Sequence, residues 1–483
     1  MSLFRKILLQ IHKITGSFLS LLFVMWCVSG IVLIYVGFPH ASRQQRFEHL
    51  DYIRSADFSK IQPLPAAITG KVELEKYPNT MVYRVYKGKK AQKVYNAQTL
   101  EAISVFNRND AIKMAESFAN SSVQKVDSMV ELDSWIPWRY YEPLLPFYKC
   151  YMNDEARTVV YVSSVSGLVV QKTDQISRWM GRIGAIPHWI YFKQLHTKAQ
   201  LRKQVVVWLG ILSLIACISG LWFGIYRLKR NDKQVISGIT VYKKWWYKWH
   251  HISGFVFGIV MSTFILSGIF YTTGVPDWMV ENTPKSPLRE WNKGIKSAPR
   301  IAPHIIWNQL RNQDGVRKIA WASYMNTNVV EVYYQDYKNP IVYRFNDKEL
   351  LEPIQLGKDE VMNYAKSLFG SEISLSVQND YDYYYEAQGM FHRPIPAFKI
   401  ELNNLYNTCL FVNPNSGKAV YYLDNNKRSR RWLAKALHKF DFPVLKSQNK
   451  LRISLLILAL LGGLFLSISS VVLGVKWFKR VIK

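Results

Sequence analysis

Cysteine is scarce in this sequence, with four residues among 483. So few cysteines exclude a disulfide-based scaffold, and the lack of a Cys-x-x-Cys pair argues against a thiol redox motif or a zinc ribbon. A Gly-rich dinucleotide-binding fingerprint is also missing. Cys27 and Cys217 fall in apolar runs and are expected to act as small apolar side chains. Nothing in the sequence decides whether Cys150 and Cys409 form a pair.

Acidic residues are missing from four apolar runs, residues 14–36, 205–226, 252–271 and 453–475. Each run has about 20 residues without a charge, which lets a helix cross a hydrocarbon core of about 30 Å. The sequence therefore predicts an α-helical membrane protein with four spans. The lack of Asp and Glu in the spans disfavours an ion pump or a carboxylate metal site.

Positive charge sets the predicted orientation, because short cytoplasmic segments are rich in Lys and Arg. The chain has 63 Lys+Arg against 34 Asp+Glu, a formal charge of +29. The N-terminal stub, the loop 227–249 and the C-terminal tail are all basic, so we expect all three in the cytoplasm. The long segments 37–204 and 273–451 are then outside, where a basic surface suits anionic lipid head groups or an anionic small ligand.

These assignments divide the chain into seven segments. Residues 1–36 are the cytoplasmic stub and first span, 37–204 the first outer region, 205–226 the second span, 227–249 the basic loop, 250–272 the third span, 273–451 the second outer region, and 452–483 the fourth span with its tail.

The chain also repeats itself once. His12 and His250 are each followed by Gly at +4 and by Ser-Gly at +17 and +18. Further along, an offset of 250 residues aligns His188 with His438 and Arg202 with Arg452. Each half is therefore predicted to consist of a span, an outer domain and a second span. Because both halves start in the cytoplasm, the repeat is parallel, with a pseudo-twofold axis along the membrane normal.

The outer regions are predicted to be α+β. Amphipathic patterns with Asn or Asp near their starts indicate helices at 109–118 and 358–368. Runs of β-branched and aromatic residues indicate strands at 80–86, 159–162, 329–334 and 410–412. Turn residues at 165–167 and 413–417 lead into further strands. We expect a helix on an antiparallel sheet once or twice in each half.

Histidines at matching depth in the two halves are the residues that indicate a chemical function. His12 and His250 lie at the cytoplasmic ends of the first and third spans, and His188 and His438 lie just outside, before the second and fourth spans. Two imidazoles opposed across a symmetry axis suit the axial positions of a haem iron. The glycines one turn after the first pair, Gly16 and Gly254, would leave room for a flat porphyrin. The pattern predicts two haem b groups with His12–His250 and His188–His438 as metal ligands.

Three further residues are candidates for binding the cofactor. His251 is adjacent to His250 and competes with it as a ligand, although the Gly and Ser-Gly spacing favours His250. Arg202 and Arg452 lie at the outer ends of the second and fourth spans, where a guanidinium group can bind an anionic haem propionate.

Four stretches of the chain resemble a known family: His12-Lys-Ile-Thr-Gly16, Ile186-Pro-His-Trp-Ile-Tyr-Phe192, Trp249-His-His-Ile-Ser-Gly254 and Ala436-Leu-His-Lys-Phe-Asp-Phe442. Together they are similar to PepSY-associated transmembrane proteins, a bacterial group that includes ferrisiderophore reductases and other membrane reductases linked to iron uptake. The resemblance implies PepSY-like outer domains and a haem-carrying four-helix bundle in the bacterial inner membrane that passes electrons outward.

Two functions follow from these observations. The first is a dihaem redox protein, and hence a candidate ferric (siderophore) reductase, that takes electrons from a separate cytoplasmic donor or from quinol and reduces an external ferric chelate or siderophore. The second is a non-enzymatic anchor whose PepSY modules bind or restrain a protease or another envelope partner. Haem content distinguishes the two. A transporter is disfavoured because no charge within the spans marks a substrate path. Membrane lipid is the other expected partner, and no nucleic acid is expected.

The predicted orientation can be tested with single introduced cysteines. Cysteines near positions 100 and 350 should react with a membrane-impermeant maleimide before the inner membrane is opened, and a cysteine in the loop 227–249 only afterwards, because the basic loop is retained in the cytoplasm. Labelling of position 350 only after the inner membrane is opened would overturn the orientation.

Overall fold

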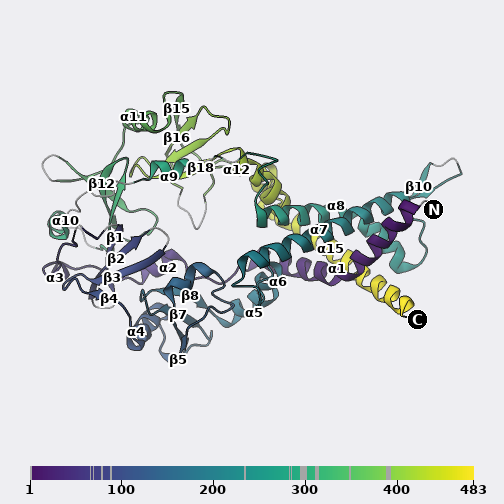
Figure 1. The fold of residues 1–483 in the computed structure, drawn as a ribbon, viewed down its shortest axis with the longest axis horizontal. Helices are drawn as coiled ribbons and strands as arrows, with labels where there is room; N and C mark the ends of the chain where they lie inside the picture. The colour runs from purple at the N-terminus through teal and green to yellow at the C-terminus, as the bar shows by residue number, and fades with distance from the viewer. Residues whose placement is uncertain are drawn as a thin grey trace. The chain divides into compact units, whose positions relative to one another are not determined.

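The computed structural model describes residues 3–65, 67–68, 70–77, 80–87, 90–232, 235–281, 283, 285–293, 302–310, 315–346, 350–387 and 393–482. The chain forms two compact units, each built from stretches that are separated in sequence (Figure 1). The first unit contains Met1–Phe38, Ile176–Val280 and Asn426–Lys483, and the second contains Pro39–Gln175 and Glu281–Asn425.

Four long helices build the first unit: α1 (Leu3–Tyr35), α7 (Ala199–Tyr226), α8 (Trp245–Thr273) and α15 (Asn449–Val481). Within the described residues, these are the helices long and apolar enough to cross a membrane, one for each predicted apolar run. Each helix is longer than its predicted apolar run, because polar and aromatic residues continue the helix at its ends. As a result, α8 begins at Trp245, inside the segment 227–249 that was assigned to the basic loop. Both α1 and α8 pack against α7 and α15, which places α1 and α8 on one diagonal of the bundle.

Small residues allow the helices to approach closely. A Cβ atom at Gly462 of α15 would lie 2.1 Å from the Phe257 ring of α8, and one at Gly463 would lie 2.5 Å from Met261 Sδ. A larger side chain at Gly462 would therefore have to displace the Phe257 ring that packs between α15 and α8. Helix association inside a bilayer depends on such small residues, because lipid tails are as apolar as the helix surfaces.

Short elements connect the long helices of this unit. They are α5 (Gln175–Ile183), α6 (Ala185–His188), β9 (Lys229–Arg230), β10 (Ile236–Gly238), α12 (Asn425–Arg430), the π-helix η2 (Arg431–Ala436), α13 (Leu437–Lys439) and α14 (Pro443–Lys446).

An antiparallel eight-stranded sheet is the centre of the second unit. Its order is β14-β13-β12-β11-β1-β2-β3-β4, so two consecutive four-strand meanders join side by side through β1 and β11. The strands are β1 (Lys71–Tyr77), β2 (Thr80–Lys87), β3 (Lys90–Asn96), β4 (Ala102–Ile103), β11 (Lys318–Tyr324), β12 (Thr327–Tyr333), β13 (Ile341–Phe345) and β14 (Leu351–Pro353).

Each meander is followed by one helix and a four-stranded sheet, so the same order of elements occurs in both outer regions. The first set is α4 (Arg108–Ala119), β5 (Val123–Met129), β6 (Phe147–Met152), β7 (Val159–Ser163) and β8 (Val169–Thr173). The second set is α11 (Lys358–Phe369), β15 (Ile373–Gln378), β16 (Ala397–Leu402), β17 (Cys409–Val412) and β18 (Ala419–Leu423).

The predicted α4 and α11 are confirmed, and the start of α4 has a clear local cause. Asn107 Oδ1 accepts a hydrogen bond from the Asp110 amide at 3.0 Å, and Asp110 Oδ2 accepts one from the Asn107 amide at 3.1 Å. This reciprocal capping box satisfies two amides that the first helical turn leaves unpaired. All four cysteines are free thiols, and the thiols of Cys150 and Cys409 are buried in different sheets.

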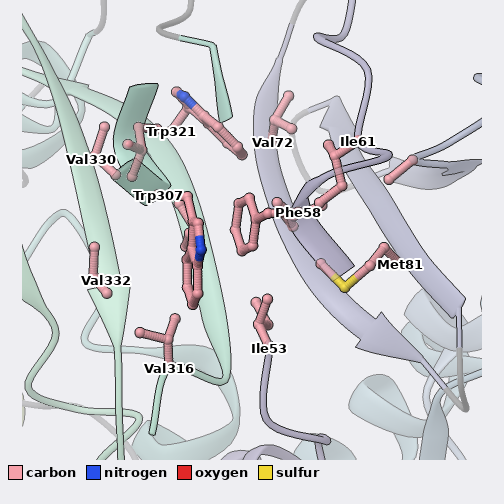
Figure 2. Close-up of a cluster of buried hydrophobic side chains, with 14 of the residues drawn as sticks. Ile53, Phe58, Ile61, Val72, Met81, Trp307, Val316, Trp321, Val330 and Val332 are labelled. Atoms are coloured by element: carbon pink, nitrogen blue, oxygen red, sulfur yellow. The ribbon is translucent and has the colours of Figure 1, made fainter. Parts of the chain in front are cut away.

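One face of the eight-stranded sheet carries an aromatic core, to which both meanders contribute (Figure 2). Phe58 of α3 (Ser55–Phe58) stacks on Trp307 of α10 (Pro303–Leu310), with ring centroids 4.1 Å apart and planes 11° from parallel. Val72 of β1 and Val330 of β12 are among the buried residues around this stack. The remaining short helices of the unit are α2 (Arg43–Glu48), η1 (Arg139–Leu144) and α9 (Pro287–Trp291).

Buried charges lie within the same sheet. Glu73 on β1 is bridged by Lys71 at 3.0 Å and by Lys318 of β11 at 3.3 Å, so an ion pair crosses the junction between the two meanders. Burial by itself raises the pKa of Glu73, but the two ammonium groups outweigh burial and hold that pKa below its usual range. Arg84 on β2 forms a second buried ion pair with Glu75 of β1.

We expect Arg84→Met to destabilise the full-length protein by about 3–5 kcal/mol, because the substitution leaves the buried Glu75 carboxylate without its partner. The apparent unfolding temperature in detergent measures this effect. Glu75→Met combined with Arg84→Met should recover most of the loss, since it removes both charges. Lys125→Ala, which breaks an exposed ion pair with Asp127, is the matched control and should leave the temperature unchanged. Equal apparent unfolding temperatures for the Arg84→Met and Lys125→Ala variants would contradict the stabilising role of the buried Arg84–Glu75 ion pair.

Candidate functional site

The structure brings the four histidines aligned by the predicted repeat together as two facing pairs. His12 of α1 and His250 of α8 have ring centroids 6.3 Å apart, with planes inclined by 44°. His188 of α6 and His438 of α13 have ring centroids 6.1 Å apart, with planes inclined by 67°. All four rings are part-buried in the first unit. We refer to these as the His12 pair and the His188 pair.

The spacing within each pair suits one metal atom between two imidazoles. Ring nitrogens bind transition metals at about 2.0–2.1 Å, so two imidazoles on opposite sides of one metal have ring centres roughly 6 Å apart. Both observed separations agree with this value.

Neighbouring helices hold the Nδ1 atoms of the His12 pair. His12 Nδ1 lies 3.0 Å from the Ala216 carbonyl oxygen and 3.4 Å from Ser219 Oγ, both on α7. His250 Nδ1 lies 2.9 Å from Ser469 Oγ on α15. The two rings of this pair are therefore fixed by the second and fourth long helices.

The His188 pair is held in the same way by the other two long helices. His188 Nδ1 lies 3.0 Å from Ser29 Oγ on α1. His438 Nδ1 lies 3.0 Å from Ser267 Oγ and 3.1 Å from the Phe264 carbonyl oxygen, both on α8. In the described part of the chain, every hydrogen bond of the four paired rings is made through Nδ1, which leaves Nε2 available to another partner.

Glycine follows the serine at three of these four positions and admits the imidazole. A Cβ atom at Gly220 would lie 2.5 Å from His12 Cε1, and Cβ atoms at Gly30 and Gly268 would lie 3.7 and 3.5 Å from the Cε1 atoms of His188 and His438. Gly16 and Gly254, the glycines expected to leave room for a porphyrin, lie instead against Ser470 and Leu466 of α15.

His251 points away from the His12 pair. Its Nε2 lies 2.8 Å from the Gly224 carbonyl oxygen of α7, and its ring lies edge-on to Tyr242, with centroids 5.5 Å apart. Neighbouring residues on a helix project about 100° apart. Of the two adjacent histidines, His250 is therefore the one that faces His12.

Arg202 and Arg452 occupy equivalent positions beside the His188 pair. Arg202 Nη1 donates to the carbonyl of Trp189, the residue after His188, at 3.2 Å. Arg452 Nη1 donates to the carbonyl of Lys439, the residue after His438, at 3.0 Å. Each arginine thus ties the turn that carries a histidine to the start of the following long helix. The expected contact with a propionate remains a prediction.

The histidines of the second pair are kept neutral by their surroundings. Burial, and to a smaller extent the neighbouring His438, lowers the pKa of His188 to about 4. Burial likewise lowers the pKa of His438 to about 4. Neutral imidazole is the form that binds metal, since a protonated ring has no free lone pair.

In the described part of the chain, each site offers two imidazoles as donors. Among the described residues, no group of three or more His, Cys, Asp or Glu side chains is placed to hold a metal ion. Protein zinc sites use three or four side-chain ligands, and calcium sites use six or more oxygens. Two opposed imidazoles suit a haem iron, because the porphyrin supplies the other four nitrogen ligands.

Sequence reasoning missed the serines that hold the rings. The Ser-Gly steps at Ser29 and Ser267 were noted as landmarks of the repeat, but no contact was predicted for them. Ser219 and Ser469 also obey the offset of 250 residues that aligns His188 with His438. Following that offset into the second and fourth spans would have found Ser219 and Ser469.

A family model described as the PepSY-associated TM region matches residues 109–340. The matched residues include His188, Arg202, His250 and His251, while His12, His438 and Arg452 lie outside them. No curated protein matches the chain.

Proposed function

We propose that this chain, a member of the PepSY-associated transmembrane family, is a dihaem protein that passes electrons across the bacterial inner membrane. His12 and His250 would ligate one haem b, and His188 and His438 the other. The observation that carries the proposal is the presence of two facing histidine pairs, 6.3 and 6.1 Å apart, with no third protein ligand described at either. When bound, such a haem takes up and releases one electron without an open coordination position.

The fold gives each residue a simple role. In this proposal the histidines would bind the iron through Nε2, because the serines and carbonyls hold the rings through Nδ1. Arg202 and Arg452 fix the turns that carry His188 and His438. On α1, His12 and Ser29 are 17 residues apart, which corresponds to about 26 Å along the helix axis. The two sites would therefore lie near opposite faces of an apolar layer of about 30 Å, with buried apolar residues such as Phe23 and Met261 between them.

The direction of transfer follows from the proposed orientation. Both termini and the basic loop lie in the cytoplasm, so the His12 pair is at the cytoplasmic face and the His188 pair at the outer face. A separate cytoplasmic protein or membrane quinol supplies the electrons. A ferric chelate or siderophore accepts them outside, which makes the chain a ferric reductase. The basic charge of the outer regions favours anionic chelates.

The arrangement predicts how four variants lose haem. His12→Ala and His250→Ala should each lose the same haem, and His188→Ala and His438→Ala should each lose the other, because each site needs both of its ligands. His251→Ala is the matched control and should keep both haems, since His251 faces Gly224. Haem content per protein and the reduced-minus-oxidised spectrum of each purified variant measure the outcome.

Two results would contradict the arrangement. Loss of one common haem in all four variants would remove the two-site assignment. A colourless wild-type protein, purified in mild detergent after expression with haem available, would remove the redox function and leave the anchored PepSY module that binds a protease or an envelope partner.

The ferric-reductase assignment predicts a charge dependence. Dithionite-reduced protein should be reoxidised faster by anionic ferric chelates than by cationic ones, and added salt should narrow the difference because it screens exposed charges beyond about 10 Å at 0.1 M. Stopped-flow absorbance at the haem bands measures the rates. Failure of every chelate to reoxidise a protein that holds two haems would exclude ferric reduction. Equal reoxidation rates for chelates of every charge would refute only the proposed role of the basic outer surface.

A further inference from the structure

We propose that Ser29, Ser219, Ser267 and Ser469 are positioning residues that fix the tautomer of the four paired histidines and tune the potential of the haem each pair holds. The inference rests on the proposed dihaem function and deepens it. We call each of these residues a serine step, meaning a helical serine whose Oγ bonds a carbonyl of its own helix and also lies against a histidine Nδ1. The four serine steps stand on α1, α7, α8 and α15, one on each long helix.

The hydroxyl hydrogen of each serine step is already used. Ser29 Oγ donates to the Trp26 carbonyl at 3.2 Å, Ser267 Oγ to the Phe264 carbonyl at 3.0 Å and Ser469 Oγ to the Leu466 carbonyl at 2.7 Å. Ser219 Oγ donates to the Ile215 and Ala216 carbonyls at 2.7 and 3.1 Å. A hydroxyl has one hydrogen to donate and two lone pairs that accept. Toward the histidine, each serine oxygen therefore acts as an acceptor.

An acceptor at Nδ1 requires a proton on Nδ1. The backbone carbonyls close to His12 and His438 lead to the same conclusion, because a carbonyl oxygen can only accept. A neutral imidazole protonated on Nδ1 has its free lone pair on Nε2. All four rings are therefore set in the tautomer in which Nε2 is the metal-binding atom, before any cofactor arrives.

A hydrogen bond from Nδ1–H also changes how strongly the ring donates electrons. Partners of this kind raise the basicity of a metal-bound histidine, and their loss typically changes metal affinity by about 10- to 100-fold. A more basic imidazole stabilises the ferric state more than the ferrous state. Loss of a serine hydroxyl should therefore raise the midpoint potential of the haem that it serves.

The four serine steps are not equal, which allows a comparison within one protein. The Oγ–Nδ1 distances are 2.9–3.0 Å at Ser29, Ser267 and Ser469, but 3.4 Å at Ser219, where the Ala216 carbonyl is the closer acceptor. Removal of the Ser219 hydroxyl should consequently have the smallest effect of the four.

Ser20 provides a matched control. It lies on α1, is buried, and its Oγ donates to the Ser17 carbonyl of the same helix at 2.9 Å. Among the described contacts, its hydroxyl has none with a histidine. Ser20→Ala therefore removes a buried helical hydroxyl of the same type without touching a ring.

The test is a redox titration of the purified holoprotein and its single variants. Ser29→Ala and Ser267→Ala should raise the potential of the His188-pair haem, and Ser469→Ala that of the His12-pair haem, each by up to about a tenfold change in the oxidation equilibrium, or about 59 mV for one electron. Ser219→Ala should shift the His12-pair haem less, and Ser20→Ala should shift neither. Ser→Thr at the same positions keeps a hydroxyl and should restore the wild-type potential.

The outcomes separate this inference from the proposed function. Two haems with potentials that are the same in Ser29→Ala, Ser267→Ala and Ser20→Ala would overturn the inference and leave the dihaem function standing. Where the protein holds no haem, nitrogen-15 spectra of labelled histidine still decide the tautomer. Nδ1-protonated rings at His12, His188, His250 and His438 would support the serine steps, and Nε2-protonated rings would refute them.

Discussion

A polar ring inside an apolar helix bundle must satisfy its N–H group within the protein, because lipid offers no partner. The four paired histidines meet this requirement on the backbone side of a neighbouring long helix. A helical carbonyl already accepts one hydrogen bond from its own helix and keeps a second lone pair. An imidazole can approach that backbone only where the adjacent side chains are small, as at Ser29-Gly30, Ser219-Gly220 and Ser267-Gly268. The position of every ring, and so the spacing of each pair, depends on this approach.

The parts of the fold that could be predicted from the sequence are those with local causes. Long uncharged runs specify α1, α7, α8 and α15 regardless of context, and the Asn107–Asp110 capping box marks the start of α4. The eight-stranded sheet has a non-local cause. Its central pairing joins β1 to β11 across about half of the chain, and nothing in either strand's own sequence names its partner. The duplication of the chain remains an interpretation, although both outer regions have the same order of elements.

For the site, too, the sequence predicted which residues matter but not their contacts with distant parts of the chain. Matching depth and spacing singled out the four histidines that the structure places face to face. The choice between His250 and His251 needed the position of Gly224 on another helix. Arg202 and Arg452 were chosen for their charge, whereas the structure shows them bound to the carbonyl after each outer histidine. Contacts between a side chain and a distant carbonyl leave no pattern in the sequence, because every residue has a carbonyl.

Each serine step holds a histidine from its own half of the chain, whereas each histidine pair combines one ring from each half. His12 and His188 are held by Ser219 and Ser29, all within residues 1–226, and His250 and His438 are held by Ser469 and Ser267, all within residues 227–483. Each pair, however, takes one ring from either half. The contacts that orient His12 and His188 therefore lie within the first 226 residues of the chain. In the proposed dihaem protein, each haem site would therefore be complete only after the fourth span has packed against the first three.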